Sequence, residues 1–146
     1  MATRVFADTN VLIAGADSRS GASRAVMIMA EIGLLKLVVS RQVLDEAERN
    51  LRRKLPRSLP VLAEQLVFID IEIVPDPDLQ ASAAWYTVIE RKDAPILEAA
   101  MQAKVDRIVT LNTKDFTPEV AEACGIRIQT PAELVEEVRR VIDSGM

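Results

Sequence analysis

The chain has 146 residues, with 22 acidic and 18 basic side chains and a formal net charge of −4. Its 49% of hydrophobic and 27% of charged residues exclude a disordered or low-complexity protein, and its length suits a single domain over residues 1–146. The absence of His and the presence of a single Cys exclude internal disulfides, imidazole or thiolate metal cages and Ser-His or Cys-His catalysis, so an active site would consist of carboxylates, hydroxyls, amides and cations.

The first half of the chain is predicted to alternate between strands and helices. In chain order, the pattern predicts a strand over 4–7, a helix over 20–32, a strand over 35–39, a helix that Ser40 caps and Pro56 ends, a helix over 58–68 and a strand over 69–74. The strand over 35–39 is almost wholly apolar, so we expect it to be buried on both faces. The strand over 69–74 alternates in polarity, which favours a position near a sheet edge.

The second half continues the alternation after a proline-rich loop over 75–78. In chain order, the pattern predicts helices over 79–89 and 96–105, a strand over 107–111, a polar turn over 112–115, a short helix from Thr117 to Gly125, a strand over 126–128 and a last helix opened by the capping box of Thr130 and Glu133. Short apolar strands interleaved with helices predict an α/β fold, in which helices cover both faces of a parallel sheet.

Four acidic residues lie where ligands gather in such a fold, near the carboxyl ends of the strands. Asp8 follows the first strand and Asp115 follows the strand over 107–111. Asp93 precedes the helix that leads to that strand, and Glu46 lies beside the buried face of the helix after Ser40. Because clustered carboxylates repel one another unless a cation lies among them, the sequence predicts a magnesium-type site for phosphodiester or phosphoryl-transfer chemistry.

Each acidic residue also has a plain structural interpretation. These alternatives are a helix cap for Asp8, a surface partner of Arg49 or of the helix N-terminus for Glu46, a helix cap beside Pro95 for Asp93 and ordinary turn chemistry for Asp115.

A basic run on the helix after Ser40 offers a candidate contact with nucleic acid. Arg49 and Arg53 lie on the Glu46 side of this helix, which predicts contact with phosphates, although such a run is also typical of a solvated helix face. Trp85 and Tyr86 are interpreted as packing residues rather than as a platform for stacked bases.

Residues 5–13, with the sequence VFADTNVLI, resemble the opening motif of PIN-domain nucleases. Residues 40–46, 92–97 and 106–116 are similar to the other motifs of this family, in the same order, so that the resemblance spans residues 4–130. It implies a three-layer α/β/α sandwich with a parallel sheet of about five strands in the order 3-2-1-4-5. It also implies that Asp8, Glu46 and Asp93 bind Mg²⁺ or Mn²⁺.

The resemblance implies a metal-dependent endoribonuclease with four acidic residues in its catalytic cluster. Asp115, or Asn112 at the position where much of the family has Asp, would orient a water molecule or a second ion. The groups that would support the ligands by hydrogen bonds are Thr9, Asn10, Thr110 and Asn112.

Many compact members of the family act as toxins of toxin-antitoxin pairs, so the resemblance implies an RNA substrate and a small antitoxin partner. Relatives commonly dimerise, so a homodimer is possible, but the sequence does not fix it. No apolar run approaches the roughly 20 residues of a membrane helix, and the chain opens with a strand rather than a signal peptide, which predicts a cytoplasmic protein. The alternative is a non-cleaving RNA-binding or protein-interaction module on the same fold. A phosphoaspartate receiver or phosphatase is disfavoured, because the phosphatase pattern has Asp where this chain has Asn10.

Overall fold

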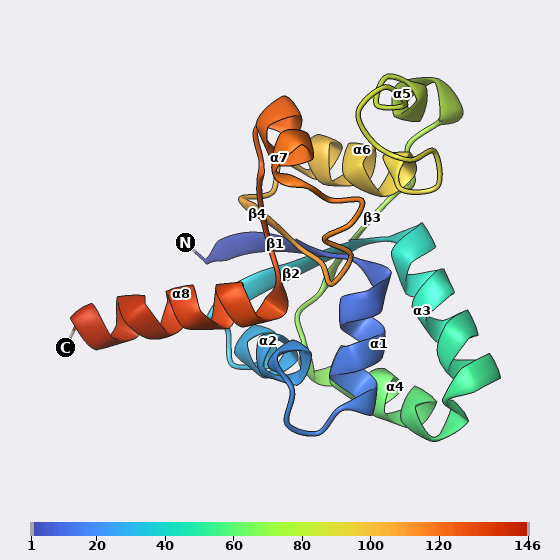
Figure 1. Cartoon of the computed structure of the whole chain (residues 1–146). Coiled ribbons are helices and arrows are strands. Elements are labelled where there is room, and N and C mark those ends of the chain that lie inside the picture. Colours follow the sequence, from blue (N-terminus) through green and yellow to red (C-terminus); the bar gives the residue numbers. More distant parts are fainter. Residues whose placement is uncertain (1, 146) are drawn as a thin grey trace.

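A parallel sheet of five strands in the order β3-β2-β1-β4-β5 forms the middle layer of the molecule. The structure is a computed structural model that describes residues 2–145. The strands are β1 (Thr3–Ala7), β2 (Leu35–Ser40), β3 (Glu72–Val74), β4 (Arg107–Val109) and β5 (Arg127–Gln129) (Figure 1). The predicted three-layer α/β sandwich and its strand order are therefore confirmed.

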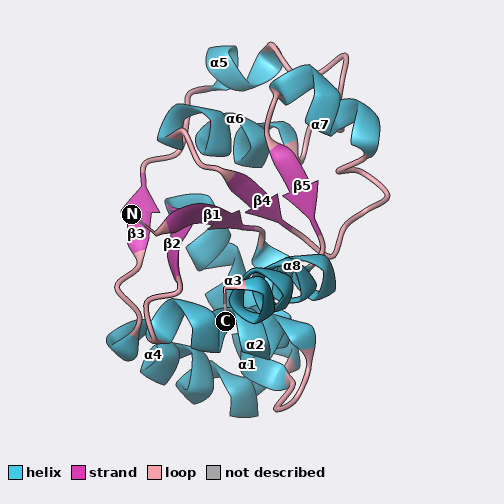
Figure 2. Cartoon of the chain, turned by 90° about the vertical axis from the view of Figure 1, so that its left-hand side faces the viewer, coloured by secondary structure: helices cyan, strands magenta, loops and turns pink. Residues whose placement is uncertain are grey.

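Helices cover both faces of the sheet, as Figure 2 shows. One layer contains α1 (Thr9–Asp17), α2 (Ala22–Glu31), α3 (Arg41–Lys54), α4 (Leu59–Phe68) and α8 (Pro131–Ser144), and the other contains α5 (Leu79–Ala83), α6 (Ala94–Ala103) and α7 (Pro118–Cys124). A short 3₁₀ turn over Pro56–Ser58 joins α3 to α4. Among residues 2–145, every helix is too short or too polar to cross a membrane.

The helix ends follow the local sequence. The Ser40 hydroxyl accepts a hydrogen bond of 3.2 Å from the backbone N–H of Val43, which caps α3. Thr130 and Glu133 form the predicted capping box at the start of α8. Gly125 ends α7 with a φ of 72°, a left-handed conformation that glycine adopts without steric cost.

The hydrophobic core lies on both faces of the central strands. Phe6 of β1 and Val38 of β2 are opposite each other in the parallel register, and both are fully buried. The expectation that the second strand is buried on both faces is confirmed, since Leu37, Val38 and Val39 are all inaccessible. The position expected for the third strand is also confirmed, because in the described part of the chain β3 pairs with β2 alone and forms one edge of the sheet.

The helix expected over 79–89 is wrong beyond Ala83, where α5 ends. The following residues form a series of turns, in which the N–H groups of Trp85 and Val88 bond to carbonyls three residues earlier. The Trp85 indole also donates a hydrogen bond of 2.7 Å to Oε1 of Glu98 on α6. This tertiary contact accompanies turns in an Ala-rich segment with high helix propensity, and propensity is readily overridden in this way. The turns lead the chain directly into Asp93.

Candidate active site

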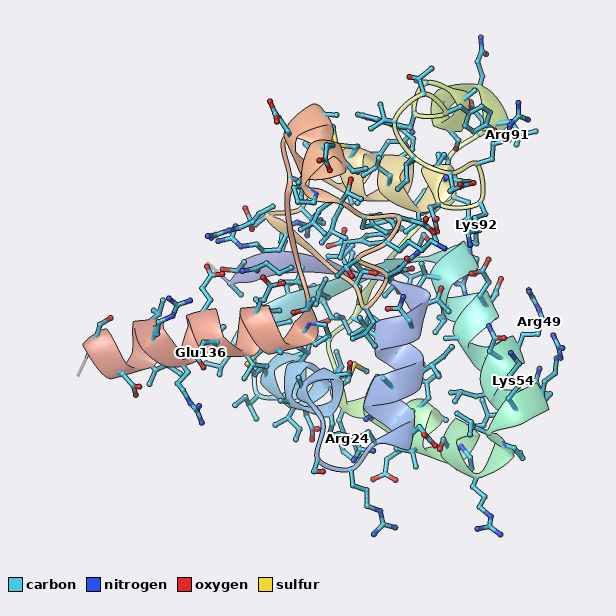
Figure 3. All side chains as sticks on the ribbon, in the orientation of Figure 1. Arg24, Arg49, Lys54, Arg91, Lys92 and Glu136 are labelled. Carbon is cyan, nitrogen blue, oxygen red and sulfur yellow. The ribbon has the colours of Figure 1, made fainter. Side chains whose placement is uncertain are left out.

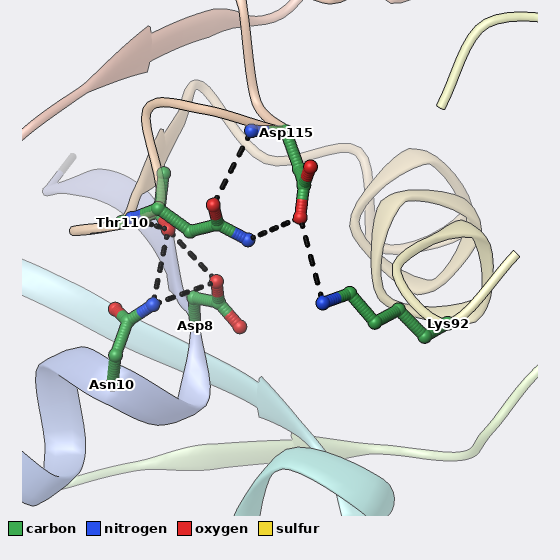
Figure 4. A network of polar contacts seen from close by, with 6 residues as sticks. Asp8, Asn10, Lys92, Thr110 and Asp115 are labelled. Atoms are coloured by element: carbon green, nitrogen blue, oxygen red, sulfur yellow. Dashed lines mark hydrogen bonds and ion pairs between the residues drawn. The ribbon is translucent and has the colours of Figure 1, made fainter. Parts of the chain in front are cut away.

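The ends of β1 and β4 place Asp8 beside Thr110. The two strands are hydrogen-bonded neighbours, and Ala7 is paired with Val109, so the next residue of each strand lies at the same edge of the sheet. The Thr110 hydroxyl donates a hydrogen bond of 2.8 Å to Oδ2 of Asp8, and the Asn10 amide donates one of 3.2 Å to the same oxygen (Figure 4). The residue after β4, Thr110, therefore fixes the carboxylate of Asp8, the residue after β1.

Asp8 is a helix cap and a member of this network at the same time. Its Oδ1 accepts a hydrogen bond of 2.8 Å from the backbone N–H of Thr9, and the side chain is 4% exposed. Burial raises the pKa of Asp8, and the nearby charge of Glu46 raises it further. The hydrogen bonds from Thr110, Thr9 and Asn10 favour the ionised form and offset part of the rise in pKa. The carboxylate is thus held in place in an environment that favours a positive partner.

Helix α3 brings Glu46 to the start of α1. The Thr9 hydroxyl donates a hydrogen bond of 3.2 Å to Oε2 of Glu46, and the Gln42 amide donates one of 3.0 Å to Oε1. Among the described residues, Glu46 forms no ion pair with Arg49 or any other cation, so the alternative of a surface ion pair is wrong. Instead, Thr9 links Glu46 to Asp8, because its hydroxyl donates to Glu46 and its backbone N–H donates to Asp8.

Asp93 and Asp115 form a carboxyl pair on the other side of the site. Asp93 is 7% exposed and precedes α6, but its side chain makes no capping hydrogen bond to that helix. Burial is the main cause that raises the pKa of Asp93 to about 7, and a hydrogen bond with Asp115 and repulsion from Asp115 and Asp8 add to it.

Asp115 remains the ionised partner of this pair. The Asn112 amide donates a hydrogen bond of 3.0 Å to Oδ2 of Asp115, and the Asp115 N–H donates one of 3.2 Å to Oδ1 of Asn112. Nζ of Lys92 lies 3.7 Å from Oδ2 of Asp115 (Figure 4). The hydrogen bonds with Asn112 and Asp93 and the charges of Lys92 and Lys114 hold the pKa of Asp115 below its usual value.

A cavity of about 470 Å³ gathers most of the predicted site. The predicted residues that line it are Asp8, Thr9, Asn10, Glu46, Asp93 and Asn112. Thr110 and Asp115 do not line this cavity but form hydrogen bonds with residues that do, namely Asp8 and Asn112. Asp115 lines a neighbouring cavity.

Three further polar residues of the wall were not predicted, namely Asn50, Lys54 and Lys92. Asn50 and Lys54 follow Glu46 at intervals of four residues, and this spacing on one helix face could have identified them. Arg49 and Arg53 are exposed on the same helix and do not line the cavity. Figure 3 shows Arg49 and Lys54 on the side of the molecule where Arg91 and Lys92 also lie.

The residues of this wall fit a divalent cation. Oδ2 of Asp93 is buried and has no hydrogen-bond partner among the described residues. Asp8, Glu46 and Asp93 offer oxygen ligands, which Mg²⁺ and Mn²⁺ prefer, and a cation would offset their repulsion. Within residues 2–145, no three acidic side chains are close enough to hold one ion together in this arrangement. At most two carboxylates would then contact the ion directly, and water would complete its coordination.

The sequence profile of the PIN domain matches residues 4–114. This match covers more than half of the chain, which therefore belongs to the PIN domain family. A comparison with curated protein sequences gives no significant match.

Similar solved structures include VapBC2 from Rickettsia felis bound to a DNA fragment from its promoter, with a TM-score of 0.64, 16% identity and coverage of 88% of this chain and 98% of that chain. A toxin-antitoxin complex from Klebsiella pneumoniae has a TM-score of 0.62 and 21% identity, and the match covers 87% of this chain and 97% of that chain. The sarcin-ricin loop cleaving toxin VapC20 from Mycobacterium tuberculosis has a TM-score of 0.55 and 12% identity, and the match covers 71% of this chain and 86% of that chain. These likenesses establish the fold.

Proposed function

We propose that this PIN domain is a metal-dependent endoribonuclease and the toxin of a toxin-antitoxin pair. The observation that carries the proposal is the convergence of Asp8, Glu46 and Asp93 on one cavity, although they come from distant segments of the chain. Metal-dependent nuclease chemistry uses such a cluster to hold a metal ion against a scissile phosphate. The similar structures support the same function, since they include VapBC2, a toxin-antitoxin complex and a sarcin-ricin loop cleaving toxin.

Asp8 and Asp93 would hold Mg²⁺ or Mn²⁺, directly or through water, and Glu46 would complete the acidic cluster. The ion would lower the pKa of an attacking water and neutralise charge on the phosphate. Thr110 and Asn10 orient the Asp8 carboxylate, because each donates a hydrogen bond to its Oδ2. Asp115, whose pKa is lowered, would stay ionised and orient a water molecule as a hydrogen-bond acceptor.

Cations around the cavity would hold the RNA. Lys54 lines its wall, as does Lys92, which is paired with Asp115, and Arg49 and Arg53 lie outside it on α3. A polyanion approaching three carboxylates requires such local positive charge, because the chain as a whole has a net charge of −4.

The test is cleavage of mixed RNA in the presence of Mg²⁺, Mn²⁺ or EDTA. We expect Asp8→Asn and Asp93→Asn each to lower the metal-dependent rate by at least about 100-fold, since each removes a ligand charge without opening a cavity. Asp143→Asn, at an exposed position on α8, is the matched control and should leave the rate unchanged. Full activity of either site variant would contradict the assignment.

The alternative function is an RNA-binding or protein-interaction module that does not cleave. The observation that favours it is Asn112, an amide at a position where a carboxylate ligand would be expected of a nuclease. RNA binding without cleavage in every divalent metal would support this alternative.

The toxin proposal also includes a small antitoxin protein as partner, a homodimer as the assembly and the cytoplasm as the compartment. A neighbouring reading frame that encodes a small DNA-binding protein would support the partner. Co-expression of that protein should suppress RNA cleavage by the purified complex. The molar mass in solution, measured by light scattering, tests the homodimer.

A further inference from the structure

A second cavity, of about 550 Å³, lies next to the acidic site. Its walls are the turns over 86–91 and the segment after β4 that contains Lys114, Asp115 and Thr117. Asp115 connects the two cavities, because Lys92, its ion-pair partner, lines the acidic one. The two cavities therefore adjoin at the ion pair of Asp115 and Lys92.

Two cations on the wall of the second cavity are free to bind a ligand. Among the described residues, neither Arg91 nor Lys114 forms an ion pair, and both are exposed. Of the two carboxylates on the same wall, Asp115 is paired with Lys92, and Glu90 has no cationic partner within residues 2–145. The unpaired charges of this wall are thus two positive and one negative, which favours an anion.

The backbone of this segment places Arg91 over an aromatic ring. Cζ of Arg91 lies 4.6 Å from the centroid of the Tyr86 ring, within the range of a cation–π contact. In a continuous helix, residues five positions apart would point about 140° away from each other. The turns that replace the expected helix after Ala83 therefore allow Tyr86 to hold the guanidinium at the cavity.

We propose that the second cavity is a phosphate subsite for the RNA nucleotide that flanks the scissile phosphate. Arg91 and Lys114 would contact the phosphate, and Tyr86 is a positioning residue that orients Arg91. A guanidinium suits this role, because its planar donors match the oxygens of a phosphate. This inference rests on the nuclease function proposed above and assigns a path for its substrate.

The experiment measures binding of a short fluorescein-labelled single-stranded RNA of mixed sequence to the full chain in EDTA over a series of salt concentrations. We expect Arg91→Ala combined with Lys114→Ala to reduce the slope of log affinity against log salt by about 0.7 for each lost phosphate contact. The control is Arg139→Ala combined with Arg140→Ala on α8, which removes the same number of charges far from both cavities and should leave the slope unchanged. Thermal melts check that both double variants fold.

Substitutions of Tyr86 test its positioning role. Tyr86→Phe keeps the ring under Arg91 and should bind RNA like the wild type. Tyr86→Leu removes the ring, and we expect roughly two- to fivefold weaker binding. This loss should vanish in the Arg91→Ala background, whereas a merely structural role of Tyr86 would give the same loss in both backgrounds.

The outcomes separate this inference from the proposed nuclease function. If the wild type cleaves RNA with Mn²⁺ but the Arg91→Ala and Lys114→Ala variant keeps the control's salt slope and KM, the subsite is wrong and the nuclease stands. If the variant flattens the slope but no metal supports cleavage, the subsite stands and the nuclease is wrong. Absence of RNA binding by the wild type would overturn both.

Discussion

The carboxyl groups of Asp93 and Asp115 shift each other's pKa in opposite directions, although one residue precedes α6 and the other follows β4. Burial and repulsion raise the pKa of Asp93 to about 7, while Asn112 and Lys92 help to hold the pKa of Asp115 low. Asp93 therefore holds the proton of the pair in the absence of a cation. Environments that push two carboxyl pKa values apart in this way are typical of acid–base sites.

The first prediction concerns the stability of the cation-free protein. Folded Asp93 binds its proton more tightly than the unfolded chain, in which its pKa is near 3.8. Its contribution to the free energy of unfolding is therefore largest below about pH 4 and is lost as the pH rises through about 7. Asn cannot ionise and can donate the same hydrogen bond to Asp115. In EDTA at about pH 8, Asp93→Asn should stabilise the protein by about 1–2 kcal/mol after solvent screening.

Chemical denaturation from pH 4 to pH 9 checks this expectation, with Asp143→Asn on α8 as the control. If Asp93→Asn is no more stable than the wild type near pH 9, burial and repulsion of the Asp93 carboxylate do not destabilise the folded protein.

A second prediction concerns the response to metal. Mn²⁺ that binds only the folded protein should stabilise it by about 2.7 kcal/mol when the free metal concentration is 100 times Kd. Asp8→Asn should weaken this effect, because it removes a ligand charge. The measurement is a thermal melt at constant ionic strength, with Ca²⁺ and EDTA as comparisons. No metal-dependent shift for the wild type would remove the physical basis of the nuclease proposal.

A third prediction tests Asn112. Its amide donates to Oδ2 of Asp115 at 3.0 Å, so Asn112→Asp replaces a favourable hydrogen bond with repulsion between carboxylates. We expect a loss of stability in EDTA. The added carboxylate is a better Mg²⁺ ligand than an amide, so calorimetric titration should show equal or tighter metal binding. Much weaker binding would contradict a role of this position near the ion.

Thr110 provides a fourth prediction. Its hydroxyl donates to Asp8 and accepts from the backbone N–H of Asn112 at 2.9 Å. Thr110→Val removes a bond that favours ionised Asp8, so the pKa of Asp8 should rise further and the acidic limb of the pH–rate profile should move to higher pH. Thr110→Ser keeps the hydroxyl and should restore the limb. Identical pH–rate profiles for Thr110→Val and Thr110→Ser would show that the Thr110 hydroxyl does not affect the pKa of Asp8.

The fifth prediction compares the basic residues of α3. Lys54 lines the acidic cavity, whereas Arg49 and Arg53 are exposed outside it. Each phosphate contact that is lost should lower the salt slope of single-stranded RNA binding by about 0.7. We expect Lys54→Ala to lower both the slope and the cleavage rate, and Arg49→Ala with Arg53→Ala to lower the slope alone. Unchanged slopes would identify a solvated helix face.

Much of this fold could be predicted because its signals are local. Apolar runs mark β1 and β2, the capping box of Thr130 and Glu133 starts α8, and Gly125 ends α7. Such patterns depend on residues only a few positions apart, and alternation of strands with helices then restricts the sheet to a parallel one. The strand order was predicted through the resemblance of the motifs to the PIN family, and the structure confirms it.

The sequence by itself determined which acidic residues stand at the ends of strands and helices, because elements in a parallel sheet run in one direction. Only the tertiary structure decided their partners. The register that pairs Ala7 with Val109 sets Thr110 against Asp8, and the turns after Ala83 bring Asp93 to Asp115 and Arg91 over Tyr86. The contacts of Thr110 with Asp8 and of Asp93 with Asp115 join residues far apart in the chain, and their distances depend on packing between layers, which no local pattern of residues records. The contact of Arg91 with Tyr86 is local, but it depends on turns that replace the helix favoured by the local sequence.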